Sequence, residues 1–321
     1  MIRFAMTRAH AYTVKAFRRE RAAPRVEVVP YDRLLAARRL ARAVYVFTDF
    51  DRLGAWDLEL AAVVHRRLAE AGVPVLNDPA RVKTRYALLR ALHEAGINAF
   101  NAYRLDECVR PARYPVFLRR EAGHGQPLSG LLADWDAVAH ASEQALADGV
   151  PASAVVIVEY AAEPERPGIF RKLALARVGE RFVPQVCVHD DNWLVKRGKL
   201  GSATPELYED DLRIVRENPF AGELARAFQI AGIEYGRADF GLVGGRVQVY
   251  EINTNPVVSP GGAHPSPQRV ESMRSAWAQF VEALHALDDR RLPGGPVRIA
   301  DARLAPHQGW RGRAVRSRSQ P

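Results

Sequence analysis

The segment from Arg237 to Pro256, RADFGLVGGRVQVYEINTNP, constrains the fold of this chain most strongly. Tyr235–Val243 and Arg246–Ile252 are rich in β-branched and aromatic residues, and the pair Gly244-Gly245 separates them. Two such segments joined at a glycine pair are typical of a β-hairpin, because glycine adopts the left-handed backbone that tight turns need. We therefore predict two antiparallel strands here.

Three oxygen-bearing side chains lie on this predicted hairpin. Glu251 and Asn253 end the second strand and share a face, because strand side chains alternate. Asp239, in the first strand, joins them only if it pairs opposite Glu251, which predicts a three-residue loop over 244–246 with a glycine in the left-handed conformation. Two facing carboxylates repel each other, and such ligands suit Mg²⁺, which completes its shell with phosphate oxygens and water. A plain hairpin carrying solvated acids is the alternative.

The motifs GRADF and EINTNP together resemble the C-terminal metal site of the ATP-grasp superfamily. Its carboxylate–amine ligases include D-alanine–D-alanine ligases and ribosomal-protein glutamate ligases. The resemblance implies that Asp239, Glu251 and Asn253 are Mg²⁺ ligands, and that Arg237 holds the transferring phosphoryl group and the oxyanion. It therefore implies ATP and Mg²⁺ as cofactors.

The composition is that of a folded protein with two or three domains: 321 residues, 48% of them hydrophobic and 26% charged. The net charge is +9, but residues 292–321 hold six arginines and one aspartate, so the rest of the chain is too weakly basic to predict a nucleic-acid partner. Two cysteines, Cys108 and Cys187, make neither a disulfide framework nor a zinc site, which favours a reducing cytoplasm. We see no membrane-spanning run and no signal peptide, and a homodimer stays open.

Residues 1–76 are predicted to form a small α/β domain, because strand, helix and strand follow at the spacing of a parallel βαβ unit. The predicted strands are Arg25–Val29, Ala43–Phe47 and Val73–Leu76, and the predicted helices are Asp32–Arg42 and Asp57–Ala71. Asp49 and Asp51 follow a strand, at the sheet edge where open α/β sheets bind ligands. Helix capping is the alternative role for them.

A helix is predicted to open at Asn77 and to run to about Glu94, before Gly96. ATP-grasp ligases have a similar helix, in which a lysine eleven residues before the glycine contacts the nucleotide phosphates. Arg85 occupies that position here. Without the resemblance, Arg85 would be an ordinary solvated charge on a helix.

A predicted strand, Tyr114–Leu118, leads through Arg119 into a loop that contains Gly123 and Gly125. The resemblance places Arg119 where the relatives have a second phosphate-binding lysine, and it implies that the loop folds over the phosphates. Glycine lets a backbone approach an anion closely, and a guanidinium still offers positive charge to phosphate.

The apolar segment Ala154–Tyr160 is predicted to be a strand. By resemblance, such a strand ends at a hinge whose backbone binds adenine, which here comprises Glu159, Tyr160 and Ala161. The resemblance also implies that Glu163 holds the ribose hydroxyls, and a surface glutamate is the alternative.

Ile169–Arg177 and Arg181–Val188 are predicted to form a second hairpin. Arg171 and Lys172 must point to opposite faces of its first strand. We favour Arg171 as the one that faces the phosphates, because the related ligases carry an arginine there. The polar loop 189–196 is expected to cover the cleft or to read the second substrate, and a plain surface loop is the alternative.

Further helices are predicted over Leu131–Gly149, Pro205–Asn218, Phe220–Gly232 and Ser266–Leu287. Together with these elements, the resemblance implies an ATP-grasp fold of the α/β class, with α+β lobes behind an N-terminal parallel α/β domain. The predicted parts are the N-terminal domain 1–100, a lid lobe 101–160, a C-terminal lobe 161–290 with the metal site, and a flexible basic tail 291–321, rich in Pro, Gly and Arg.

The resemblance implies an ATP-dependent ligase. A small-molecule or peptide carboxylate would attack the γ-phosphoryl group to give an acyl phosphate, and an amine or other nucleophile would displace the phosphate. One alternative is an ATP-grasp phosphotransferase, in which Asp49 or Asp191 would serve as base. The other is a nucleotide-binding protein without turnover, because arginine occupies both expected lysine positions.

Overall fold

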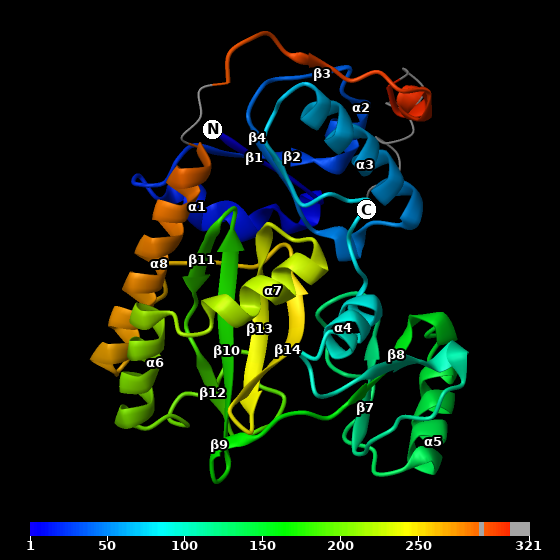
Figure 1. Ribbon diagram of the computed structural model, residues 1–321, viewed down its shortest axis with the longest axis vertical. Helices are drawn as coiled ribbons and strands as arrows, with labels where there is room; N and C mark the ends of the chain where they lie inside the picture. Colours follow the sequence, from blue (N-terminus) through cyan, green and yellow to red (C-terminus); the bar gives the residue numbers. More distant parts are fainter. Residues whose placement is uncertain (289–291, 309–321) are drawn as a thin grey trace.

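The computed structural model describes residues 1–288 and 292–308. Figure 1 shows an N-terminal domain at one end of the molecule, and a C-terminal lobe and a smaller lid lobe side by side below it. Helices and sheets alternate, and the first sheet is parallel, which confirms the predicted α/β class.

The N-terminal domain is built on a four-stranded parallel sheet in the order β2-β1-β4-β5. Its strands are β1 (Ile2–Met6), β2 (Val26–Pro30), β4 (Val44–Phe47) and β5 (Val75–Leu76), and its helices are α1 (Lys15–Arg19), α2 (Tyr31–Ala36) and α3 (Ala55–Glu70). Strand β4 is apolar and buried along its whole length, as a parallel strand between helical layers must be. The predicted helix over 32–42 is too long, because Ala37 is extended and Arg39–Leu40 form a short strand, β3.

The lid lobe is an antiparallel sheet in the order β6-β8-β7, covered by helix α5 (Figure 1). Its elements are β6 (Ala102–Arg104), β7 (Val116–Arg120), α5 (Trp135–Ala147) and β8 (Val155–Glu159), and α4 (Arg85–Glu94) precedes them. Both α4 and α5 begin later than predicted, at the side chains that cap them. Thr84, rather than the expected Asn77 or Asp78, caps α4, and Asp134 caps α5, each accepting a hydrogen bond from a first-turn N–H.

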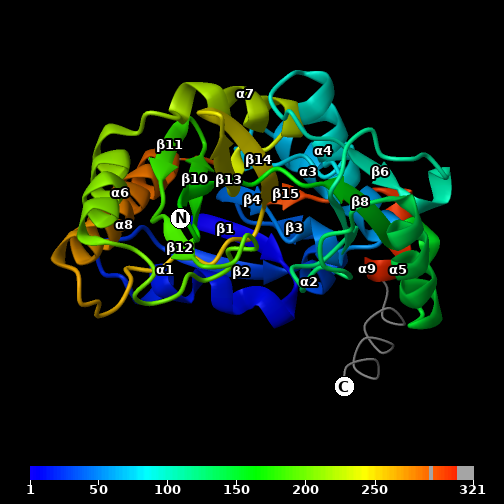
Figure 2. The same cartoon turned by 90° about the horizontal axis from the view of Figure 1, so that it is seen from below.

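The C-terminal lobe holds a six-stranded antiparallel sheet in the order β11-β10-β13-β14, with β9 and β12 also paired to β10. Its strands are β9 (Pro164–Arg166), β10 (Ile169–Val178), β11 (Arg181–Pro184), β12 (Val188–Asp190), β13 (Tyr235–Val243) and β14 (Arg246–Asn253), and its helices are α6 (Pro205–Glu217), α7 (Ala221–Ala231) and α8 (Pro267–Asp288). Helix α7 packs on one face of the sheet, and α8, with α6 beside it, lies on the other (Figure 2). No described helix is long and apolar enough to span a membrane.

The hairpin of β13 and β14 has the predicted register. Asp239 lies opposite Glu251, and Arg237 lies opposite Asn253. Residues that pair directly across an antiparallel ladder place their side chains on the same face. The two carboxylates therefore share one face, as the sequence pattern predicted.

The turn of this hairpin is shorter than predicted. Val243 pairs with Arg246, which leaves a two-residue turn of Gly244 and Gly245, with φ angles of 55° and 72°. A two-residue turn by itself would place the two acids on opposite faces. The ladder shifts by one residue at a bulge beside Tyr250, and this extra residue restores the shared face.

Asn77 joins the N-terminal domain to the C-terminal lobe. Its amide group donates to the carbonyls of Phe47 (2.9 Å) and Tyr235 (2.7 Å), and its oxygen accepts from the N–H groups of Glu234 (2.8 Å) and Tyr235 (2.9 Å). Asn77 is fully buried and has a φ of 61°, a conformation that asparagine tolerates better than most residues. The joint therefore depends on an asparagine at this position.

The prediction that the whole segment 291–321 is a flexible tail is wrong for its described part, residues 292–308. Val297–Arg298 form strand β15, which pairs with β3 of the N-terminal domain, and a short helix, α9 (Ala305–Gln308), follows. Ile299 and Leu304 are buried in the N-terminal core. These few apolar residues return the chain to the first domain, and they are too sparse to show a period. Residues 309–321 lie outside the described part.

Candidate nucleotide site

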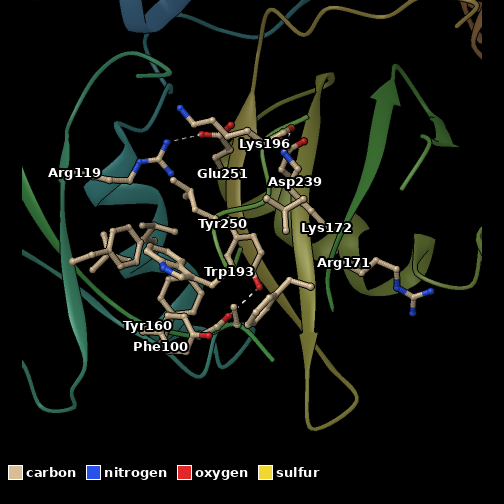
Figure 3. Close-up of a pocket in the computed structure, with 18 of the residues that line it drawn as sticks. Phe100, Arg119, Tyr160, Arg171, Lys172, Trp193, Lys196, Asp239, Tyr250 and Glu251 are labelled. Carbon is tan, nitrogen blue, oxygen red and sulfur yellow. Dashed lines mark hydrogen bonds and ion pairs between the residues drawn. The ribbon is translucent and has the colours of Figure 1, made fainter. Parts of the chain in front are cut away.

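A cavity of about 350 Å³ lies between the lid lobe and the C-terminal lobe (Figure 3). Part of its wall is apolar or aromatic and comprises Leu89, Phe100, Phe117, Val158, Tyr160, Trp193, Leu242 and Tyr250. The Trp193 ring packs against those of Phe117 and Tyr160, with centroids 5.0 and 5.6 Å apart. The remainder of the wall carries the hairpin carboxylates and several cations. The cavity therefore combines an aromatic slot with a charged pocket.

Asp239 is held by two cations of its own lobe. Lys172 Nζ donates to its Oδ2 (3.0 Å), and Arg237 Nε donates to its Oδ1 (2.8 Å). Asp239 is 3% exposed, and burying a charged side chain is costly unless it is paired and hydrogen-bonded, as it is here. Arg237 therefore lies beside the predicted metal ligand, as the motif implied.

Glu251 is held by cations of the lid side. Arg85 and Arg119 lie 3.4 and 3.7 Å from its Oε2, and His124 of the glycine loop lies 3.8 Å from its Oε1. Burial alone would raise the pKa of Glu251, but His124, Arg119 and Arg85 outweigh it and hold that pKa well below its usual range. The carboxylate is therefore ionised at neutral pH.

Arg85 and Arg119 both reach the charged pocket but differ in what they bind. Arg85 also donates to the carbonyls of Glu121 (3.1 Å) and Gly123 (2.9 Å), so it braces the glycine loop. Arg119 has Glu251 as its ion-pair partner within the described residues. Burial, together with the nearby Arg85, lowers the pKa of Arg119. Arg119 is therefore the better placed of the two to bind an incoming anion.

The structure corrects the prediction that Arg171 faces the phosphates. Arg171 borders the cavity, but its guanidinium lies behind the sheet, 2.5 Å from Asp210 and 3.0 Å from Glu165, and Figure 3 shows it pointing away from the labelled carboxylates. Lys172 points to the other face and reaches Asp239. Strand alternation required that only one of Arg171 and Lys172 face the cavity. It could not decide which one, because the acids of α6 that attract Arg171 are distant in sequence.

The hinge residues border the cavity in different ways. The Glu159 carboxylate faces away from it, accepting hydrogen bonds from Tyr103 Oη (2.9 Å) and from Arg113, so only its backbone can serve a nucleotide. Tyr160 and Ala161 line the cavity. Glu163 also lines it and accepts a hydrogen bond from the Gly244 N–H (2.6 Å), which ties the hinge to the tip of the hairpin. The adenine and ribose roles stay predictions.

His124 connects the N-terminal domain to the site. Its Nε2 lies 3.5 Å from Asp51 Oδ2, while its Nδ1 faces Glu251. The Glu251 carboxylate raises the pKa of His124. Sequence reasoning treated His124 as an interruption of the glycine loop, because neither of its two acidic neighbours is close in the chain.

The two other acids considered as bases do not line the cavity. Asp49 is buried and accepts hydrogen bonds from Thr7 N (3.0 Å) and from His10. Asp191 is exposed and paired with Lys199. Asp49 therefore has a structural role, and neither residue supports a phosphotransferase mechanism.

Trp193 and Lys196 belong to the polar loop 189–196, for which a place at the cleft was one of the predicted alternatives, and both line the cavity, although no role was predicted for either side chain. Both come from the loop after β12, and Lys196 Nζ lies 3.4 Å from the His124 carbonyl. Burial and the charge of Arg119 lower the pKa of Lys196, which indicates crowding of positive charge. A usable signal existed: the chain has only five lysines, and two of them, Lys172 and Lys196, line this cavity.

The donor set fits a magnesium ion bound with phosphates. Asp239 and Glu251 supply two carboxylates that line one cavity, and Asn253, which also lines it, supplies an amide oxygen. Among the described residues no group of three or more His, Cys, Asp or Glu side chains could hold a metal. A set with two carboxylates suits Mg²⁺, which leaves its other positions to phosphate and water, better than it suits a metal that needs a complete protein cage.

The three lobes enclose a cavity whose wall passes from an aromatic slot to a charged pocket with paired carboxylates. No family model and no curated protein matches this sequence. Among solved structures, the chain is similar to D-alanine–D-alanine ligase from Bacillus anthracis complexed with ATP (11% identity, 91% of this chain and 100% of that chain, TM-score 0.48). It is also similar to a RimK-domain ATP-grasp protein from Sphaerobacter thermophilus (17% identity, 89% of this chain and 98% of that chain, TM-score 0.49). A third similar structure is the ATP-grasp ligase PsnB complexed with a minimal precursor (15% identity, 89% of this chain and 98% of that chain, TM-score 0.52). The similarity to PsnB, with a TM-score of 0.52, shows that this chain has the ATP-grasp fold that the motif predicted.

Proposed function

We propose that this protein is an ATP-dependent ligase that activates a carboxylate as an acyl phosphate and transfers the acyl group to an amine or another nucleophile. The observation that carries the proposal is the pair of hairpin carboxylates, Asp239 and Glu251, facing one cavity whose wall passes from aromatic to cationic. PsnB, an ATP-grasp ligase, shares the fold, which is consistent with this assignment.

The aromatic slot suits adenine and the cationic end suits the triphosphate. Phe100, Tyr160 and Trp193 offer flat apolar contacts, and the hinge offers backbone polar groups. Lys172 and Lys196 lie at the charged end, where several positive groups can neutralise phosphate oxygens. ATP bound in this orientation would place its γ-phosphate close to the hairpin.

Asp239, Glu251 and Asn253 would hold the magnesium ion. When bound, such an ion neutralises charge that develops on the transferring phosphoryl group. The cations that now pair with the two carboxylates, Lys172 and Arg119 among them, would then serve the phosphates. Arg237, beside Asp239, would stabilise the oxyanion formed at the acyl carbon.

A second substrate can reach the carboxylates from the side of the N-terminal domain. An adjoining cavity of about 190 Å³ shares Arg85, His124 and Glu251 with the first and extends to Phe50 and Leu58 of that domain. Its wall is largely apolar away from the shared residues. Bringing the carboxylate, the phosphoryl donor and the nucleophile together is most of what such a reaction needs from the protein.

The test is an assay of ADP and free phosphate with Mg-ATP and a panel of amino acids and short peptides. A ligase releases both products only when carboxylate and nucleophile are present. ADP without free phosphate, with the phosphate on the acceptor, would show a phosphotransferase, and nucleotide binding without ADP would show a module without turnover. Either result would contradict the proposal.

Two variants link the activity to the hairpin. Asp239→Asn and Glu251→Gln should abolish turnover, because each nearly isosteric change removes a carboxylate that Mg²⁺ would need. Each change also takes a partner from buried cations, so urea unfolding should establish that the variant is folded under the assay conditions. Asp136→Asn and Glu143→Gln, on the exposed face of α5, are matched controls that should keep full activity. Undiminished turnover in both hairpin variants would exclude the metal assignment.

A further inference from the structure

A third cavity, of about 220 Å³, lies beside the nucleotide site and is not used by the proposed reaction. It is enclosed by β12, the segment after it, and the beginnings of α6 and α8. The polar residues of its wall are His189, Arg197, Lys199, Tyr208, His264 and Arg269. Three of these are cations, of which Lys199 is paired with Asp191 outside the cavity, and no carboxylate of the described residues lines it, so its wall favours an anion.

The floor of this cavity is a buried histidine–aspartate pair. His189 Nε2 lies 2.8 Å from Asp211 Oδ2, and the two residues are 4% and 0% exposed. The other ring nitrogen, His189 Nδ1, is buried and has no hydrogen-bond partner among the described residues. Buried polar nitrogens are rarely left unpaired, so this one indicates a missing partner.

Arg269, in the first turn of α8, provides a second and independent indication. One of its guanidinium nitrogens donates to the Cys187 carbonyl, and none has a carboxylate within 4.0 Å in the described part of the chain, although the buried Asp211 acts on its charge from a longer distance. Most arginines of this protein that are as well buried have an acid beside them, as Arg171 does. An arginine placed in a cavity without an acid is suited to bind one from outside.

The remaining polar groups complete a ring of donors. His264 Nδ1 accepts a hydrogen bond from the Ser266 N–H (3.1 Å), so its proton is on Nε2, which lies 3.4 Å from Tyr208 Oη. Tyr208 and Lys199 also line the cavity. Arg197 borders both this cavity and the nucleotide cavity.

We propose that this cavity is an oxyanion subsite that binds the carboxylate or phosphate group of a small molecule, with the Arg269 guanidinium as its main anchor. The volume accommodates such a group with a few further heavy atoms. The subsite lies outside the aromatic slot and the paired hairpin carboxylates, so it can be occupied when ATP is not bound. Its existence therefore does not depend on the ligase assignment.

The experiment is calorimetric titration of inorganic phosphate, and separately of succinate, into the nucleotide-free protein at constant ionic strength. Arg269→Gln should weaken binding about ten-fold or more, because it removes a charge-assisted contact. Arg269→Lys should recover part of the affinity. Arg274→Gln is the matched control, because Arg274 lies on the exposed face of the same helix, and it should bind as the wild type does.

Inorganic phosphate could also bind at the cationic end of the nucleotide cavity, and the variant Arg119→Ala separates the two sites. Binding that survives in Arg119→Ala and weakens in Arg269→Gln supports the subsite. The opposite pattern, or no binding of either anion, overturns it. Phosphate-only or succinate-only binding that depends on Arg269 supports the subsite and identifies the group it prefers.

Modification of the wild-type protein keeps the proposal testable if Arg269→Gln does not fold. Phenylglyoxal reacts with accessible arginines, and mass spectrometry reports the modified positions. The bound anion should slow modification of Arg269 several-fold and leave Arg274 unaffected. Equal modification of Arg269 with and without the anion would overturn the proposal.

Discussion

The two neighbouring cations of β10 provide a sharp test of the site, because they point to opposite faces of one strand. Lys172→Met removes the Nζ atom that lies 3.0 Å from Asp239 Oδ2 and keeps an unbranched apolar side chain. Arg171→Met removes the guanidinium that binds Asp210 and Glu165 behind the sheet. The first change should affect nucleotide binding and the second should affect stability.

The expected loss for Lys172→Met follows from its place in the charged pocket. The side chain is 18% exposed, so solvent screens its charge only in part. A hydrogen bond to a charged group contributes about 1.5–3 kcal/mol, so the Kd for Mg-ATP should rise roughly 10- to 150-fold. Asp239 keeps Arg237 as a partner, so the loss of folding stability should be small.

The expected loss for Arg171→Met is of another kind. Asp211 is fully buried and lies 3.6 Å from the Arg171 guanidinium. Removing one partner of a buried ion pair leaves an uncompensated charge and costs about 3–5 kcal/mol. The free energy of unfolding should fall by about that amount, whereas the Kd for Mg-ATP should change little at a temperature where the variant is folded.

Both quantities should be measured on each variant, by calorimetric titration with Mg-ATP and by urea unfolding. The reasoning requires a crossed pattern, with affinity lost in Lys172→Met and stability lost in Arg171→Met. Equal loss of affinity in both variants, with unchanged stability, would show that Arg171 turns into the cleft and that the assignment of faces is mistaken.

Three further predictions concern other parts of the chain. Asn77→Ala removes four buried hydrogen bonds and requires alanine at a positive φ, so the free energy of unfolding in urea should fall by about 3–5 kcal/mol. A fall below about 1 kcal/mol would contradict the role of Asn77 in joining the N-terminal domain to the C-terminal lobe. Arg119→Ala should weaken Mg-ATP binding by about 1.5–3 kcal/mol, Arg119→Lys should recover part of it, and titration showing wild-type affinity for the alanine variant would make Arg119 dispensable. Burial raises the pKa of the Cys187 thiol well above its usual range, so a thiol reagent at pH 8 should modify one cysteine, Cys108, in the native protein and two after denaturation; rapid native labelling of Cys187 would contradict its burial.

The local sequence was sufficient wherever the determining interactions are close along the chain. Alternating residues and a glycine pair predict the hairpin, and the motif spacing placed Asp239 opposite Glu251. The predicted loop length was wrong because two local geometries produce the same pairing of Asp239 with Glu251. One is a three-residue loop, and the other is a two-residue turn with a bulge. The bulge beside Tyr250 decides between them.

The sequence by itself determined the hairpin and the shared face of its two carboxylates through alternation and spacing, and the resemblance of its motifs to the ATP-grasp superfamily predicted the fold. Only the tertiary structure decided which cation of β10 faces the cleft, that Glu159 binds Arg113 instead of facing the cavity, and that Val297–Arg298 pair with β3. Each of these depends on a partner tens to hundreds of residues away. A cationic side chain points toward the acidic residue that folding places beside it, and the local sequence pattern does not indicate which acidic residue that is.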